Sequence, residues 1–196
     1  MITDTTKVKR WGRWLATFVG FPAAGLAARA VAGNIDSIGA AALGGLAGGA
    51  VLGGIQAYVG GIPAADRLRW SGATAVGFAV GLTTGAGVVG FRTDSTSLVV
   101  MGAVSGAAVG LAQVLAAKMT MGDRALWVLA TPVLWAGGWL ISSQVIVDAD
   151  QQHAIFGSSG ALTVAALAGV LFALRRPVSE TGVQVVAANS TGSVVA

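Results

Sequence analysis

Long apolar stretches alternate with short polar ones along most of the chain. Six stretches of about 20 residues or more occupy positions 11–32, 38–62, 70–91, 98–117, 126–147 and 154–174. A helix rises 1.5 Å per residue, so each stretch is long enough to cross a hydrocarbon core about 30 Å thick. Strands of a membrane barrel would be shorter and would alternate in polarity. The pattern predicts an all-α polytopic membrane protein with six transmembrane helices.

The composition agrees with a membrane protein. Of 196 residues, 55% are hydrophobic and only 10% are charged, and there is no cysteine. A soluble domain carries about 25% charged residues, because its surface faces water. The hydrophobicity excludes disorder, and the lack of cysteine excludes a disulfide or thiolate–metal framework. The first apolar run has no signal-peptide cleavage motif, so we expect it to remain as a span.

The basic residues predict how the helices are oriented. Ten of them precede the first span, lie in the second or fourth loop, or follow the sixth span: Lys7, Lys9, Arg10, Arg13, Arg67, Arg69, Lys118, Arg124, Arg175 and Arg176. Because Lys and Arg favour cytoplasmic loops, we expect both termini in the cytoplasm, with a polar N-terminus over 1–10 and a flexible tail over 177–196. This distribution explains the net charge of +4 better than nucleic-acid binding does.

Similarity at a displacement of 57 residues indicates an internal repeat. The segment GAAVGLAQ at 106–113 is similar to GAVLGGIQ at 49–56, and the DRALW at 123–127 to the DRLRW at 66–70. The repeating unit is a helical hairpin used three times, over about 11–62, 70–117 and 126–174. The three copies share one orientation. They either surround an axis along the membrane normal, as parallel repeats do in some transporters, or form a bundle without symmetry.

Glycines recur every four residues in three predicted helices. They are Gly45, Gly49 and Gly53 in the second, Gly77, Gly81 and Gly85 in the third, and Gly102, Gly106 and Gly110 in the fourth. Residues four apart share a helix face, and small residues there let two helices approach closely. Bending, or lining a pore with carbonyl groups, is the alternative role. The regular period favours packing, so we predict a glycine zipper with these helices at the centre of the bundle.

Three polar side chains within the spans are candidates for a solute site or for structural contacts. Arg29 lies near the outer end of the first span, where it can snorkel, pair with Asp36 or another outer-loop acid, or bind an anion. Gln56 and Gln113 occupy equivalent positions of the repeat. An amide in hydrocarbon needs partners, so this pair either bonds between helices or faces a common cavity. In the third copy Phe172 is aligned there, which argues against a symmetric polar ring.

Six tryptophans divide into two groups. Four lie at the predicted cytoplasmic starts of helices, namely Trp11, Trp14, Trp70 and Trp127. Indoles favour the headgroup region, so we expect these four to anchor helices there. Trp135 and Trp139 lie deeper, and either pack as a ridge into a glycine groove or face lipid or a partner. Pro22 and Pro132 predict kinks in the first and fifth spans.

No residue pattern points to catalysis. His153 is the only histidine, in a polar loop beside Asp148 and Asp150. Catalytic zinc sites usually use two or three His or Cys ligands, so we interpret it as a solvated loop histidine. No acid lies near the middle of a span, which leaves a proton relay without residues. We expect no enzyme activity, no catalytic residue, no metal and no cofactor.

One part of the sequence resembles a known group of proteins. The Gly-x-x-x-Gly-x-x-Gln hairpin, followed by DRALWVLAT at 123–131 and WAGG at 135–138, resembles uncharacterised bacterial multi-spanning membrane proteins. In that group Trp and a basic loop follow the Gln, whereas Ala57 follows Gln56 and Val114 follows Gln113 here. The resemblance covers mainly the fourth and fifth spans. It implies a bacterial inner membrane and carries no activity.

Two classes of function remain. The first is a non-catalytic accessory or scaffold subunit that acts through contacts between helices, with lipid and with other membrane proteins or a second copy as partners. The second is a small-solute carrier, channel or substrate-capture subunit of an uptake system. Its support is an analogy of size and layout with the substrate-binding subunits of vitamin uptake systems. A wet, polar interior would distinguish the second class from the first. The visible amides are few, which favours the first class.

Overall fold

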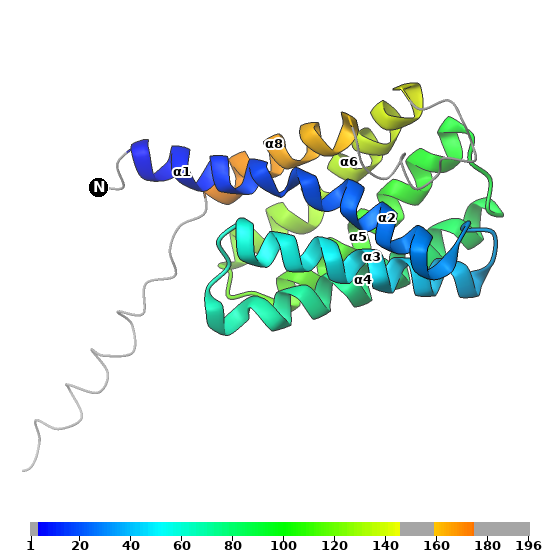
Figure 1. The fold of residues 1–196 in the computed structure, drawn as a ribbon. Coiled ribbons are helices and arrows are strands. Elements are labelled where there is room, and N and C mark those ends of the chain that lie inside the picture. Colours follow the sequence, from blue (N-terminus) through cyan, green and yellow to red (C-terminus); the bar gives the residue numbers. More distant parts are fainter. Residues whose placement is uncertain (1–3, 146–158, 175–196) are drawn as a thin grey trace, which may run out of the picture.

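The computed structural model describes residues 4–145 and 159–174, and every element in these ranges is helical (Figure 1). The elements are α1 (Asp4–Leu15), η1 (Ala16–Val19), α2 (Gly20–Ala32), α3 (Ile38–Val59), η2 (Ala64–Asp66), α4 (Arg67–Val89), α5 (Ser95–Ala116), α6 (Met121–Val145) and α8 (Ser159–Leu174). Within the described ranges, five helical segments are long and apolar enough to cross a membrane. The all-α prediction is therefore confirmed. The start of the predicted sixth span, the loop with His153 and the tail lie outside the described residues.

The first span is longer than predicted and is interrupted. Its helix begins at Asp4, within the segment expected to be a polar N-terminus, and a 3₁₀ turn separates α1 from α2. Pro22 is the third residue of α2 and has no N–H to bond to the carbonyl of Phe18. The regular series of α-helical hydrogen bonds is therefore interrupted just before it, at η1. The kink expected at Pro22 is thus a 3₁₀ turn. By contrast, α6 stays helical through Pro132.

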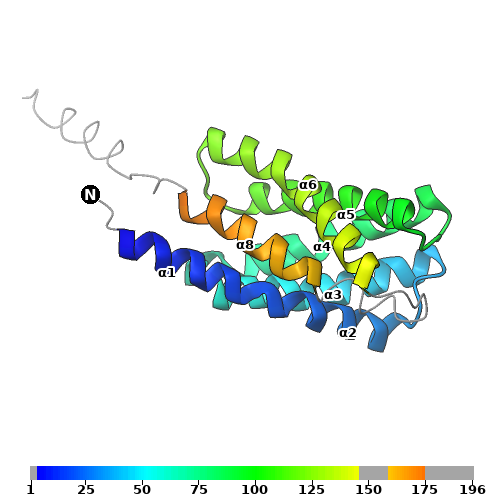
Figure 2. The ribbon, with the colours of Figure 1, turned by 90° about the horizontal axis from the view of Figure 1, so that it is seen from above.

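The helices are packed in the order of the sequence, and the ring they form is closed. Helix α2 packs against α3, α3 against α4, α4 against α5, and α5 against α6. Helix α8 then packs against both α6 and α1, and Figure 2 shows it lying between them. Trp11 Nε1 on α1 donates to the carbonyl of Ala166 on α8 over 3.1 Å. The first and last described helices are therefore neighbours, and side chains from all around the ring meet inside it.

Glycine faces bring successive helices into close contact. A Cβ atom added to Gly49 on α3 would lie 2.7 Å from the Cα of Ala75 on α4, and one added to Gly81 on α4 would lie 2.6 Å from the Cα of Ser105 on α5. The glycines of α5 meet α6 in the same way: a Cβ on Gly106 would lie 2.7 Å from a backbone carbonyl oxygen. Each glycine face thus contacts the next helix along the chain. The three glycine-rich helices make these close contacts as consecutive members of the ring.

The deeper tryptophans occupy the glycine groove of α5. Trp135 and Trp139 are 4% and 3% exposed. A Cβ on Gly102 would lie 3.1 Å from the Cγ of Trp139 and 2.9 Å from the carbonyl oxygen of Trp135. Trp135 also meets Phe21 and Phe78 edge to face, with ring centroids 5.6 and 5.3 Å apart. Of the two interpretations of this pair, the ridge in a glycine groove is confirmed.

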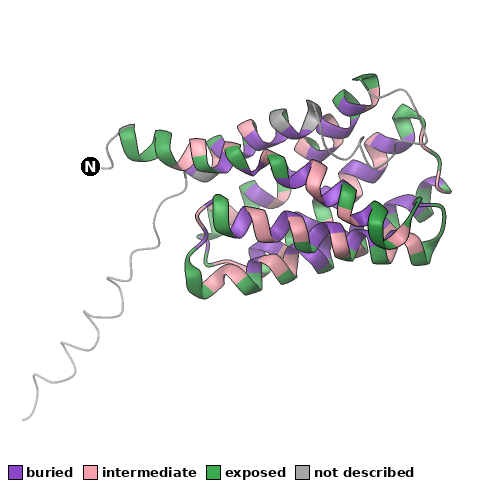
Figure 3. Ribbon diagram, viewed as in Figure 1, coloured by how far each residue is buried: buried purple, intermediate pink, exposed green. Residues whose placement is uncertain are grey.

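Polar side chains are buried together with aromatic and aliphatic ones, and further large apolar side chains are exposed on the outside. The buried polar residues are Thr17, Gln56, Thr74, Ser97, Ser105, Gln113, Thr131 and Ser142. Exposed residues on the helices include Leu43, Val80, Leu111 and Leu129, each more than half exposed. Figure 3 shows buried and exposed residues mixed along α3, α4 and α5, whereas the start of α1 is exposed. In water this arrangement would leave much apolar surface solvated, whereas hydrocarbon outside and polar groups bonded inside suit a bilayer.

Helix ends in the loops are capped by side chains. Ser37 accepts a hydrogen bond from the N–H of Ala40 at the start of α3, and Asp94 accepts one from the N–H of Ser97 at the start of α5. The hydroxyl of Ser97 also donates to Asp94 over 2.6 Å. These bonds, with help from Arg92, lower the pKa of the Asp94 carboxyl because they favour its charged form. Such caps satisfy backbone donors that a helix start leaves unpaired.

Candidate functional site

Gln56 on α3 and Gln113 on α5 are hydrogen-bonded to each other. Gln113 Nε2 donates to Gln56 Oε1 over 3.0 Å, and also to the Thr74 hydroxyl on α4 over 3.0 Å. The two glutamines are 6% and 1% exposed. One amide therefore joins three helices, two of which, α3 and α5, lie on either side of α4.

Two indole groups complete the network. Trp70 Nε1 on α4 donates to Gln56 Oε1 over 3.2 Å, and Trp127 Nε1 on α6 donates to Gln113 Oε1 over 3.0 Å. Each tryptophan follows its glutamine by 14 residues, at the start of the next helix. The turn between two helices is just long enough to bring the indole N–H back to the depth of the amide. The network thus runs from α3 through α4 and α5 to α6.

The indoles determine how both amides are oriented. An indole N–H can only donate, so the atom facing it must be the oxygen of the amide. With Gln113 Oε1 held by Trp127, both N–H groups of Gln113 are directed to Gln56 and Thr74. Gln56 Oε1 accepts from Trp70 and Gln113, which leaves Gln56 Nε2 pointing elsewhere. Among the described residues, no protein acceptor takes either N–H of Gln56 Nε2.

Threonines accompany the tryptophans on the same helices. The Thr74 hydroxyl donates to the carbonyl of Trp70 over 2.9 Å, and Thr131 donates to that of Trp127 over 2.6 Å. In η1, Thr17 donates to the carbonyl of Trp14 over 2.7 Å. These bonds use the hydroxyl hydrogen within the helix itself, so each threonine oxygen keeps lone pairs for a further donor.

Three of the tryptophans form an interior cluster. Trp14, Trp70 and Trp127 are 2%, 1% and 5% exposed. The ring centroids are 6.0 Å apart for Trp14 and Trp70, 5.7 Å for Trp14 and Trp127, and 6.4 Å for Trp70 and Trp127. The prediction that these three anchor helices at the headgroups was wrong. Their indoles instead fill the inside of the ring, where they contact one another, and Trp70 and Trp127 also donate to the glutamines.

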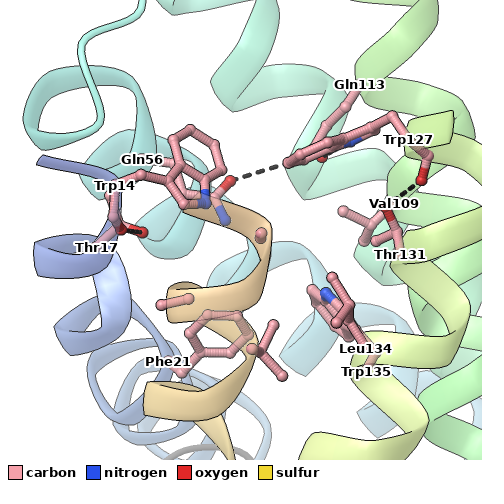
Figure 4. Close-up of a pocket in the computed structure, with 13 residues that line it drawn as sticks. Trp14, Thr17, Phe21, Gln56, Val109, Gln113, Trp127, Thr131, Leu134 and Trp135 are labelled. Atoms are coloured by element: carbon pink, nitrogen blue, oxygen red, sulfur yellow. Dashed lines mark hydrogen bonds between the residues drawn. The ribbon is translucent and has the colours of Figure 1, made fainter. Parts of the chain in front are cut away.

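A cavity of about 20 Å³ lies beside this network. Its walls come from all three hairpins, and its polar residues are Gln56, Gln113, Thr17 and Thr131. The remaining lining residues are Trp14, Phe21, Val109, Trp127, Leu134, Trp135, Val164, Ala165 and Ala168. Figure 4 shows the glutamines at one end of the cavity, with Phe21 and Trp135 toward the other. Both sequence-based alternatives for the glutamines hold together: they bond between helices, and they face a common cavity.

Arg29 is separate from this site. It lies at the opposite end of the bundle, in the last turn of α2, where its side chain is exposed and its Nη1 donates to Asn34 Oδ1. The alternative that Arg29 pairs with Asp36 was therefore wrong, because Asn34 in the same loop is its partner. Arg29 and the two glutamines do not belong to one binding site in this structure.

Two parts of the site were missed in the sequence. The tryptophans were assigned to the membrane surface because they stand beside arginines, and Thr74 and Thr131 were not singled out at all. The spacing contained a usable signal, since Gln56 and Gln113 are each followed after 14 residues by a Trp and after 18 residues by a Thr. Comparison with protein-family models, with curated proteins and with solved structures gave no match. The function is therefore inferred from this site and its surroundings alone.

Proposed function

We propose that the chain is an integral membrane protein without catalytic activity, an accessory or scaffold subunit that acts through helix–helix contacts. The supporting observation is where the polar groups are used. Gln113 directs its amide to Gln56, Thr74 and Trp127 inside the bundle, while the outer helix faces are apolar. A solute site must offer polar groups to its solute, whereas a scaffold needs a rigid interior and an outer surface that fits other helices.

A small-solute carrier, channel or capture subunit is the second candidate, and the cavity is the observation that favours it. Gln56 and Gln113 both line the cavity. Its volume of about 20 Å³ has room for roughly one water molecule, while ligand pockets typically measure about 300–1,000 Å³. This candidate requires the helices to separate before a solute can enter. Arg29 would meet an anionic group only after releasing Asn34.

The proposal includes three repeated hairpins arranged around an axis along the membrane normal, held by a glycine zipper. The bond between Gln56 and Trp70 recurs between Gln113 and Trp127, 57 residues later. The close glycine contacts recur from α3 to α4, from α4 to α5 and from α5 to α6. The closed order of the ring also suits three equivalent hairpins. Duplication of one stable hairpin would produce this recurrence of contacts.

The proposal further places the protein in a bacterial inner membrane with both termini in the cytoplasm. Its support is the distribution of charge. Arg13, Arg67, Lys118 and Arg124 lie at the end of the bundle that holds the start of α1, and the loops at the other end contain Asp36. Cytoplasmic loops attract cations, and the cytoplasmic leaflet is anionic. Lipid, a second copy or other membrane proteins are then the partners, and no nucleic acid is involved.

Photo-crosslinking in native membranes tests the scaffold role. A photoreactive residue is placed in turn at exposed Leu43, Val80, Leu111 and Leu129, one on each of four helices, and at buried Leu52 as the control. A scaffold subunit gives one discrete protein adduct from one or two neighbouring helices and none from Leu52. Lipid adducts alone at all four exposed positions would contradict the proposal.

Flux measurements distinguish the second candidate. The purified chain in vesicles is compared with Gln56→Met and Gln113→Met, whose side chains keep the length of glutamine without its amide. For a scaffold, both variants lose thermal stability and no solute flux depends on the protein. A flux that the wild type supports, and that a folded glutamine variant loses, would establish the solute role instead.

A further inference from the structure

Three helices carry the same pattern of buried residues, with one difference at the end. The pattern has a small residue at position i, an apolar residue at i+3, a second small residue at i+4 and a last residue at i+7. It reads Gly49, Leu52, Gly53, Gln56 on α3, Gly106, Val109, Gly110, Gln113 on α5, and Ala161, Val164, Ala165, Ala168 on α8. Positions spaced in this way share one helix face. Ala168 therefore stands where the other two helices carry glutamine.

Packing on α1 supports this alignment. Gly169 follows Ala168, and a Cβ added to it would lie 3.2 Å from Cδ1 of Trp11 and 3.4 Å from Cδ1 of Trp14. Helix α8 thus meets the last part of α1, the helix that carries Trp14 and is followed by Thr17 in η1. The last residue of its pattern lies beside a Trp and Thr pair, as Gln56 lies beside Trp70 and Thr74. The counterpart is Ala168, four residues before the expected Phe172.

The cavity occupies the space beside Ala168. Ala168 and Ala165 line it together with Gln56, Thr17 and Thr131. An alanine side chain is four heavy atoms shorter than a glutamine side chain, so it leaves the space that a third amide would fill. The two N–H groups of Gln56 Nε2, on a residue 94% buried (100% minus its 6% exposure), have no protein acceptor among the described residues. Leaving a buried amide donor unbonded costs free energy.

We propose that this cavity is a binding site for one water molecule, which takes the place of the third glutamine amide. The volume suits one water, and a buried water typically makes about three hydrogen bonds. Gln56 Nε2 is the donor to the water oxygen. Thr17 lies on the same side of the cavity as Gln56 in Figure 4 and donates its own hydrogen to the carbonyl of Trp14, so its oxygen can accept a hydrogen of the water. The water then links α3 to η1 and extends the polar network toward α8.

Magnetisation transfer from water tests the proposal in the intact chain. The side-chain amide protons of Gln56 and Gln113 are observed by NMR in detergent micelles or nanodiscs, with selective ¹⁵N labelling of glutamine. Gln113 serves as the internal control, because both of its N–H groups are bonded to protein. We expect nuclear Overhauser cross-peaks at the water frequency for Gln56 and none for Gln113. Their absence at Gln56, or equal cross-peaks at both residues, would overturn the proposal of one bound water.

Two variants of Ala168 provide a second measurement. Ala168→Gln supplies an amide that accepts from Gln56, whereas Ala168→Met adds an unbranched side chain of the same length without an acceptor. The water cross-peak of Gln56 should disappear in Ala168→Gln. Its midpoint of thermal unfolding should lie roughly 2–4 °C above that of Ala168→Met, the shift produced by about 1 kcal/mol in a chain of this size. An equal or higher midpoint for Ala168→Met would show that the cavity needs no acceptor, and the proposal would fail.

Discussion

Gln113 Nε2 lies 3.0 Å from Gln56 Oε1, so a hydrogen bond joins two residues that are 57 positions apart and lie on different helices. This bond is the centre of the polar network inside the ring. Trp70 donates to Gln56 Oε1 and Trp127 donates to Gln113 Oε1. These two bonds determine the direction in which each amide group points. Because hydrocarbon outside the bundle offers no competing partners, the network specifies how α3, α4, α5 and α6 are placed against one another.

Removing the Gln113 amide should destabilise the fold more than removing that of Gln56. Gln113→Met loses three interhelical bonds, and Gln56→Met loses two. At about 0.6–1.7 kcal/mol for each such bond, we expect losses of about 2–5 and about 1–3 kcal/mol. Reversible unfolding in bicelles or mixed micelles measures both. Gln144→Met, the same change at an exposed residue whose amide makes one interhelical bond, of 3.4 Å to Ser95, is the control. A loss for Gln113→Met no larger than that control would contradict the structural role of the network.

A methyl group on the α3 face that meets α4 should force the two helices apart. In Gly49→Ala the new Cβ would lie 2.7 Å from the Cα of Ala75 and 2.8 Å from the carbonyl oxygen of Thr74, and a backbone cannot move aside locally. We expect a loss of about 1–3 kcal/mol in the same unfolding assay. Gly54→Ala on the same helix meets nothing within 4 Å and is the matched control, with no loss. Equal effects at the two positions would mean that helix propensity, not packing, governs these glycines.

Single cysteines can establish the orientation, because the chain has none of its own. Thr96→Cys lies exposed at the start of α5, and Ala65→Cys lies exposed in η2, at the other end of the bundle. With both termini in the cytoplasm, a membrane-impermeant maleimide added to intact cells should label Thr96→Cys and leave Ala65→Cys unlabelled until the membrane is opened. The reverse labelling would show the opposite orientation.

Acid should weaken the start of α5 through Asp94. Ser97 bonds lower the pKa of Asp94 in the folded chain, so its charged form contributes stability above the unfolded pKa of about 3.9. That contribution is lost as the pH falls through the lower, folded pKa. We expect the unfolding midpoint of the wild type to fall more between pH 5 and about pH 3 than that of Asp94→Asn, which caps the helix without titrating. Parallel pH profiles of the unfolding midpoint for the two proteins would show that ionisation of Asp94 does not contribute to stability.

The spans and their helical state followed from the sequence, because crossing hydrocarbon demands apolar stretches with every backbone group bonded internally. The four-residue glycine period likewise identified the faces that contact other helices, since period alone places residues on one face. The pairing of Gln56 with Gln113 was among the expected alternatives for the same reason: two amides at equal depth in hydrocarbon need partners. These are properties of single helices in a low-dielectric solvent, which a linear pattern records.

The closed ring, and what meets inside it, depended on tertiary structure. Trp14, Trp70 and Trp127 stand beside basic residues as interfacial anchors do, and only the packing of α8 against α1 and α6 turns their indoles inward. The equivalence of Ala168 with the two glutamines was likewise hidden, because an alanine in an apolar helix has no pattern of its own. Burial and the neighbours on other helices decide whether an indole anchors a helix at the membrane surface or fills the interior of the bundle. They also decide whether an alanine side chain is closely packed or leaves a cavity beside it. Those quantities exist only once the helices are assembled.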